Sequence, residues 1–320
     1  NKKYKNNIFK VLPSFQNNMK DTPYLWWGSL LTLALLIGYS ASGQAQNKKY
    51  PYVDTTYADI DRLEVSGRFC RVKIETTERS SQVTLKGEIR GWHRRSRFEI
   101  MHEKIGKTLR VWIDDLSVNS AALPTKSYLH FKVPPTIELD IKNSSGGIFA
   151  SNLKGKEHRL RTTSGMINLA GVQAEKIIAR TTSGGIRLQK VTATLGAQSS
   201  SGMVKLVQVK GDIRVRTSAG GIRLKNVEGK LQLRTNAAAI TGEQVLLTSN
   251  AHFRTSAGKI RMKFTNDLQK LNFNLKASAA KLWIGKERYR RRVILKNGPN
   301  ITVKGISNAG SQRYETFVGK

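Results

Sequence analysis

The sequence predicts an all-β fold, a parallel β-solenoid with coils of about 18–20 residues. Three observations predict it. A short phrase rich in Ser, Thr and Gly recurs along the chain, apolar residues alternate with polar ones on both sides of it, and Gly interrupts these segments too often for helices. A unit that recurs every ~20 residues is typical of repeat architectures, in which each coil contacts only its neighbours.

The phrase occurs in eight forms: KNSSGGI, RTTSGMI, RTTSGGI, QSSSGMV, RTSAGGI, RTNAAAI, RTSAGKI and KASAAKL. The apolar residues that close it are spaced by 19, 19, 18, 18, 18, 20 and 22 residues: Ile148, Ile167, Ile186, Val204, Ile222, Ile240, Ile260 and Leu282. A Gly-rich phosphate loop would occur once per site. The repetition therefore indicates one corner of every coil.

Each corner is flanked by short strands. A second apolar residue follows the closing one by two positions in several copies, as in Leu169 and Leu188, and a third follows by five, as in Val172 and Val191. Before the phrase the same alternation predicts another strand, with inward pairs such as Ile177 and Ala179. Each coil should thus have two short strands, a tight corner, and a third apolar anchor at a looser bend.

The corner position two residues before the closing apolar residue is Gly in six copies and Ala in two. Because Ala would be strained at positive φ, this pattern predicts a close approach of backbones rather than a left-handed residue. Ser or Thr stands three residues upstream in most copies, and we expect these hydroxyls to form a ladder across coils. A catalytic serine would be singular, whereas this one is replicated.

The chain divides into four parts by pattern. Residues 136–320 form the regular solenoid with a C-terminal cap, in which residues 293–310 are a last hairpin or coil with a turn at Asn297-Gly298. Residues 46–135 are strand-like but irregular, and should begin the solenoid and cap its open end. Residues 19–45 resemble a secretory signal peptide, with a retained membrane anchor as the alternative, and residues 1–18 resemble a mis-started leader.

The composition limits the possible functions. The formal net charge is +33, which suggests anionic partners rather than a particular fold. The one cysteine, Cys70, excludes an intrachain disulfide; its alternating strand context favours a buried apolar role over a reactive thiol.

An enzyme is the weaker alternative. Lyases and hydrolases on related folds need clustered carboxylates or a Ca²⁺ site built from them. Acidic residues of the repeat region share no repeat position, and Asp114-Asp115 should point to opposite faces of a strand. The five histidines lack metal-binding spacing. We therefore expect neither a catalytic site nor a metal or other cofactor.

Basic residues recur at two repeat positions. Six residues before the closing apolar residue the copies carry Lys142, Arg161, Arg180, Gln198, Arg216, Arg234, Arg254 and Lys276. One residue after it stand Arg187, Lys205, Arg223 and Arg261. Stacking predicts two cationic rows, which either bind an anion or only cover the flank of the solenoid with hydrated side chains. Further basic clusters lie at 93–97 and 288–292.

The phrase VPPTIELDIKNSSGGI and the repeats that follow it resemble the bacterial putative-adhesin family with head-GIN-type β-solenoid domains, over roughly residues 57–318. The resemblance implies an exported, right-handed, parallel β-helix-like protein of a Gram-negative bacterium. The strongly basic charge departs from the family pattern, so the resemblance assigns no ligand.

These observations predict an exported, non-enzymatic adhesin-like binding module at the cell surface, in the periplasm or secreted. We expect its basic rows to bind anionic glycan, lipopolysaccharide or extracellular DNA by charge pairing; the nine candidate anion-binding residues are Arg161, Arg180, Arg216, Arg234, Arg254, Arg187, Lys205, Arg223 and Arg261. The alternatives are a scaffold that binds another envelope protein and a carbohydrate-active enzyme.

Overall fold

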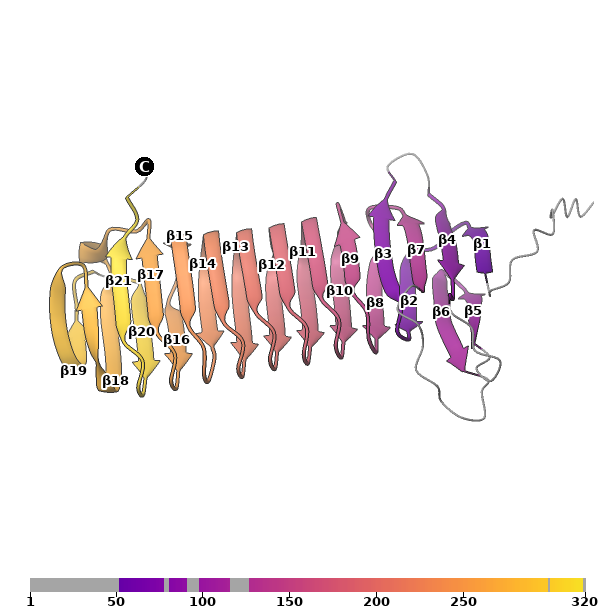
Figure 1. Ribbon diagram of the computed structural model, residues 1–320. Helices are drawn as coiled ribbons and strands as arrows, with labels where there is room; N and C mark the ends of the chain where they lie inside the picture. Colours follow the sequence, from indigo (N-terminus) through magenta and orange to yellow (C-terminus); the bar gives the residue numbers. More distant parts are fainter. Residues whose placement is uncertain (1–51, 78–80, 91–97, 116–126, 299, 319–320) are drawn as a thin grey trace, which may run out of the picture. The chain divides into compact units, whose positions relative to one another are not determined.

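A computed structural model describes residues 52–77, 81–90, 98–115, 127–298 and 300–318, which belong to one compact unit. Within these ranges the chain forms 21 strands and one short 3-10 helix, and most strand pairs are parallel (Figure 1). The all-β parallel solenoid is thus confirmed. The expected leader, the expected signal peptide and the basic cluster at 93–97 lie outside the described residues.

The strands that precede the regular coils are β1 (Tyr52–Tyr57), β2 (Arg62–Gly67), β3 (Arg71–Thr76), β4 (Val83–Glu88), β5 (Phe98–Ile105), β6 (Thr108–Asp115) and β7 (Tyr128–Val133). The regular coils comprise β8 (Glu138–Asn143), β9 (Ile148–Ser151), β10 (Lys154–Thr162), β11 (Ile167–Thr181), β12 (Ile186–Ser199), β13 (Val204–Thr217), β14 (Ile222–Arg234), β15 (Ile240–Leu247), β16 (Ala251–Thr255) and β17 (Ile260–Phe264). The last elements are η1 (Leu268–Lys270), β18 (Asn272–Ile284), β19 (Glu287–Leu295), β20 (Thr302–Ser307) and β21 (Gln312–Thr316).

Successive coils pair in parallel and in the register that the repeat predicts. Ile167 lies opposite Ile186, and Ile186 lies opposite Val204. These residues are buried, as are the leucines two positions later. Strand alternation places every second residue in the core, so identical repeat positions stack into continuous apolar rows about 4.8 Å apart.

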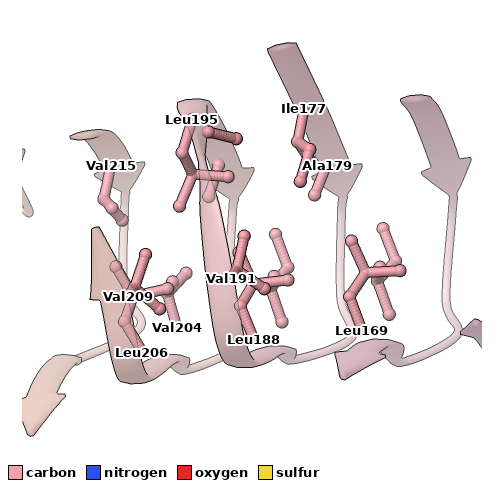
Figure 2. Close-up of a cluster of buried hydrophobic side chains, with 14 of the residues drawn as sticks. Leu169, Ile177, Ala179, Leu188, Val191, Leu195, Val204, Leu206, Val209 and Val215 are labelled. Carbon is pink, nitrogen blue, oxygen red and sulfur yellow. The ribbon is translucent and has the colours of Figure 1, made fainter. Parts of the chain in front are cut away.

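Two walls enclose this core. Figure 2 shows Ile177 and Ala179, which precede a tight corner, facing residues such as Leu169 and Leu188, which follow one. The side chains that alternate with them therefore point outward on opposite walls of the solenoid. We call the wall that precedes each tight corner wall A and the wall that follows it wall B.

The tight corner depends on a close approach of backbones. A Cβ atom added to Gly184 would lie 1.8 Å from the carbonyl oxygen of Gly165 in the preceding coil. The same conflict recurs at four further corner glycines, none of which has a positive φ angle: Gly165, Gly202, Gly220 and Gly258. The predicted close approach is confirmed at these five positions, while Gly146 combines it with a φ of +128°.

The corner hydroxyls stack across coils, because Thr162, Thr181 and Ser199 lie opposite one another in the strand register. Thr181 Oγ1 donates to the oxygen of Gly165 and accepts from the N–H of Gly184, both at 3.1 Å. Ser199 bridges Gly184 and Gly202 in the same manner. The predicted ladder of hydroxyl residues is therefore present in the strand register, and its hydrogen bonds go to backbone groups of the corners.

The looser bend contains one left-handed residue in six of the coils. Lys190 and Gln208 have φ angles of 53° and 54°, and each directly precedes the third apolar anchor of its coil. The same position is occupied in other coils by Asn152, Gly171, Asn226 and Gln244. This residue turns the chain so that Val191 and Val209 point into the core.

The first coil is inserted out of chain order. Strand β2 pairs in parallel with both β6 and β8, and β3 pairs with both β7 and β9. Leu63 consequently lies between Leu109 and Leu139. Strands β4 and β5 then pair antiparallel with β7 and β6 at this end.

The C-terminal end also contains a coil that is inserted out of chain order. Strands β20 and β21 lie between the β16–β17 coil and β18, so the tail forms a coil but not the outermost one. Here Gln312 replaces the closing apolar residue and lies between Ile260 and Leu282. Its side chain donates to Ser307 and accepts from Tyr314, each at 2.9 Å, so this buried polar group is satisfied.

Strand β19 pairs antiparallel with β18 and carries the basic cluster at 288–292. Charged side chains on such a strand discourage pairing with other chains. Cys70 is fully buried between β2 and β3, which confirms its predicted apolar role, and burial raises the pKa of its thiol to about 11.

Candidate anion-binding surface

Wall A carries the first basic row that the repeat predicts. Arg161 lies opposite Arg180 in the strand register, and Arg216 lies opposite Arg234, which in turn lies opposite Arg254. All five side chains are exposed. We call the in-register set on wall A the arginine ladder: Lys142, Arg161, Arg180, Arg216, Arg234 and Arg254, with Gln198 between Arg180 and Arg216.

The ladder is shorter than the sequence suggested. Lys276 was expected to follow Arg254 as the eighth rung. The inserted coil instead places Ile306 between them, because Ile306 pairs with both residues. The continuous row therefore ends at Arg254.

The ladder cations are uncompensated by neighbouring carboxylates. None of the five ladder arginines forms an ion pair with another residue that the structure describes. Like charges one strand spacing apart repel each other, at a cost of up to about 1 kcal/mol per pair. A bound polyanion would remove this repulsion, so the ladder is suited to an extended anionic ligand.

Wall B carries the second basic row. Arg187, Lys205 and Arg223 lie on successive coils in register, and Thr241 then separates Arg223 from Arg261. Arg313 of the inserted coil extends the row beyond Arg261. Sequence reasoning missed Arg313 because Gln312, not an apolar residue, closes that copy of the phrase.

The two rows do not merge into one surface. Arg180 precedes a tight corner on wall A, whereas Arg187 follows the same corner on wall B. Because the inward residues of the two walls face each other, the outward cations point away from each other across the corner. A single rigid polymer would therefore contact one row at a time.

Wall A also contains a hollow of about 380 Å³ where the ladder is interrupted. Its floor is the outward face of the coil with Thr194, Gly196 and Gln198, whose side chains are short or neutral. Outward side chains of the neighbouring coils complete the lining: Lys176, Ile178, Arg180, Asp212, Arg214, Arg216, Lys230 and Gln232. We call this depression the Gly196 hollow.

The charged groups around the Gly196 hollow differ in their partners. Lys176 forms a 2.9 Å ion pair with Glu157, and Arg214 donates a 3.0 Å hydrogen bond to Gln232. Arg180 and Arg216 have no ion-pair partner among the described residues. These two guanidinium groups are therefore available to a ligand above Gly196.

Carboxylates gather at the other end of wall A, which the sequence did not predict. Arg62 lies within 3.5 Å of Glu64, Glu138 and Asp140, because the inserted first coil brings β2 beside β8. Acidic residues of the repeat region still share no repeat position, and the cluster forms because Glu64 comes from β2, outside the repeats. The cluster could not be predicted from the sequence, because no repeat indicates that β2 pairs with β8.

Two acidic residues on wall A, Glu64 and Glu157, have a lowered pKa. The hydrogen bond from Arg62 lowers the pKa of Glu64, and the one from Arg159 lowers the pKa of Glu157. A general acid for glycoside hydrolysis requires the opposite shift.

In the part of the chain that the structure describes, no group of three or more His, Cys, Asp or Glu side chains could hold a metal ion. Within the same ranges, nothing helical has the length and apolar character of a membrane span.

Comparison with known proteins identifies a related domain. Residues 71–215 match the family model described as Toastrack DUF4097, a stretch that begins with β3 and ends in β13. No curated protein sequence matches the chain.

Several solved structures are also similar to this chain. A putative adhesin from Bacteroides fragilis is 12% identical, with a TM-score of 0.39 over 83% of this chain and 97% of the other. A putative adhesin from Parabacteroides distasonis is 10% identical, with a TM-score of 0.33 over the same shares. A putative cell adhesion protein from Clostridium sporogenes is 10% identical, with a TM-score of 0.26 over 84% of this chain and all of the other.

Proposed function

We propose that this protein is an exported, non-enzymatic, adhesin-like module that binds anionic polymers of the cell envelope or its surroundings along the arginine ladder. The observation that carries the proposal is the in-register stack of exposed arginines without ion-pair partners among the described residues. The arginines of adjacent coils lie about 4.8 Å apart, and Arg180 and Arg216 lie twice that distance apart across Gln198, so the row presents a linear array of positive charge to a polymer. As part of this proposal, the repeats are assigned to the head-GIN-type adhesin domains that they resemble.

Binding of this kind is mainly electrostatic. A polyanion that contacts several arginines displaces its own counterions, so the affinity should fall steeply as salt increases. It should depend more on charge spacing than on the identity of the repeat unit. Cell-surface glycan, lipopolysaccharide phosphate and extracellular DNA all meet that requirement.

The enzymatic alternative has less support. Among the described residues the carboxylates with shifted pKa values, Glu64, Glu75 and Glu157, are all shifted downward, and each interacts with a basic side chain. Such groups stabilise charge but do not donate a proton near neutral pH. A binding module needs no such group.

The proposal is tested with a variant that replaces five ladder arginines by glutamine: Arg161, Arg180, Arg216, Arg234 and Arg254. A matched control loses the same charge at five exposed lysines outside both rows: Lys132, Lys190, Lys225, Lys263 and Lys286. Binding of dextran sulfate is measured by calorimetry over a salt series. We expect the ladder variant to lose at least about 10-fold in affinity and to show a shallower salt dependence, whereas the control changes little.

Equal losses in both variants would show that total charge, not the ladder, determines binding. Absence of binding by the unmodified protein at low salt would overturn the proposal. Retained circular dichroism spectra of both variants would confirm that the coils remain folded.

A further inference from the structure

The Gly196 hollow interrupts an otherwise regular wall. In register, Gly196 lies between Ile178 of the preceding coil and Arg214 of the following coil. Two residues after Gly196, on the same strand, Gln198 lies between Arg180 and Arg216. The hollow is therefore centred on the coil with Gly196, where Arg180 and Arg216 lie two strand spacings apart, about 10 Å, and it extends to Lys230 and Gln232 of the next coil.

The hollow combines three kinds of group. Arg180 and Arg216 present guanidinium groups on opposite sides, and Asp212 presents a carboxylate that accepts hydrogen bonds. Ile178 provides an apolar wall, and Gly196 provides a floor without a side chain. Together these groups match a flat ring that carries an acidic group, several hydroxyls and an apolar face.

We propose that the Gly196 hollow is a subsite for one uronic-acid residue of an acidic polysaccharide. This inference rests on the proposed function, since the remaining ladder arginines would bind the neighbouring units. The carboxylate of the sugar pairs with Arg180 or Arg216, because a planar guanidinium donates two parallel hydrogen bonds to a carboxylate. The hydroxyls donate to Asp212, and the C–H face of the ring packs against Ile178 and Gly196.

The same groups disfavour a nucleic acid at this position. No aromatic side chain lines the hollow, so a base has nothing to stack on. The carboxylate of Asp212, in contrast, can accept a hydrogen bond from a sugar hydroxyl.

Gly196 itself provides a direct way to test the subsite. An added Cβ would have the carbonyl oxygen of Ile177 as its nearest neighbour, at an ordinary contact distance of 3.9 Å. The φ angle at Gly196 is not in the left-handed region. A larger side chain can therefore be accommodated by the fold, and it would fill the hollow without changing the charge of the ladder.

The test uses Gly196→Leu and the control His252→Leu, which places the same side chain at the equivalent exposed position of wall A, three coils further along. Binding of tetragalacturonate, the tetranucleotide dT4 and long dextran sulfate is measured for both variants and for the unmodified protein at low salt. We expect Gly196→Leu to weaken tetragalacturonate binding at least 10-fold and to leave dextran sulfate binding within a factor of two. The control should leave both unchanged.

The outcomes separate the two proposals. If dextran sulfate binds but tetragalacturonate does not bind, or binds equally well to Gly196→Leu, the subsite is overturned while the ladder proposal stands. If dT4 binds as tightly as tetragalacturonate and loses as much in Gly196→Leu, the hollow does not select a sugar. If dextran sulfate fails to bind the unmodified protein, the ladder proposal itself is wrong.

Discussion

The hydroxyl of Thr181 donates a 3.1 Å hydrogen bond to the carbonyl oxygen of Gly165, which lies one coil earlier. The same oxygen atom of Thr181 accepts from the N–H of Gly184 in its own corner, also at 3.1 Å. One buried side chain thus satisfies two backbone groups and connects adjacent coils. The hydrogen bonds of the corner therefore hold adjacent coils together, in addition to the packing of the apolar rows.

Replacing Thr181 by Val should destabilise the solenoid by about 1–3 kcal/mol, because the shape is kept while two buried backbone groups lose their partner. Urea unfolding followed by circular dichroism measures this change. Thr182→Val is the matched control, since Thr182 is exposed and makes no side-chain hydrogen bond to another described residue. A loss of the same size in the control would show that the hydroxyl of Thr181 is not the cause.

Two glycines, twelve residues apart in sequence, should respond in opposite ways to substitution. Gly184→Ala places a methyl group 1.8 Å from a backbone oxygen and should cost about 1–3 kcal/mol through overpacking. Gly196→Ala makes only an ordinary contact, 3.9 Å from the oxygen of Ile177, and should be neutral or stabilise by up to about 1 kcal/mol. Thermal unfolding of the two variants distinguishes these effects, and a tolerated Gly184→Ala would contradict the close approach.

His158 should lower the stability of the protein in mild acid. It is fully buried between Leu139 and Ile177 of adjacent coils, and neither ring nitrogen has a partner among the described residues. Burial lowers its pKa from 6.5 to about 4. Between these two values the unfolded chain binds a proton that the folded chain does not, so stability should fall by up to about 3 kcal/mol as the pH drops from 6.5 to 4.

The variant His158→Leu should be more stable at neutral pH by about 1–3 kcal/mol, because it removes unpaired polar atoms from an apolar row. Its stability should also change less than that of the unmodified protein between pH 6.5 and 4. Urea unfolding at several pH values tests both points, with the exposed His252→Leu as control. An unchanged pH dependence would mean that His158 is protonated or paired in the folded state.

His252 should report whether the ladder is occupied. Partial burial, followed by the positive charges of Lys304 and Arg254, lowers its pKa. A polyanion bound along Arg254 would offset these charges and raise the pKa of His252 towards its ordinary value. Nuclear magnetic resonance titration with dextran sulfate measures the shift, and uncharged dextran is the control. A pKa that stays constant at saturating dextran sulfate would argue against binding at this end of the ladder.

Much of the central solenoid could be predicted because its determinants are local. The alternation of residues such as Ile177 and Ala179 identifies the buried side of each strand, and the corner Gly identifies the point of close approach. The arginine ladder followed from the same register. Arg313 could not be found this way, because Gln312 interrupts the apolar signature of its coil and is accommodated by a hydrogen-bond network instead.

The sequence by itself determined the coil length, the inward rows and the repeat positions of the cations, since each depends on a period that one or two coils already contain. The tertiary structure alone decided the order of coils at both ends, the carboxylates around Arg62 and the position of Ile306 beyond Arg254. It also decided the Gly196 hollow, whose lining comes from adjacent coils that stack in register. These features depend on contacts between segments far apart in the chain, and such contacts leave no periodic trace in the sequence.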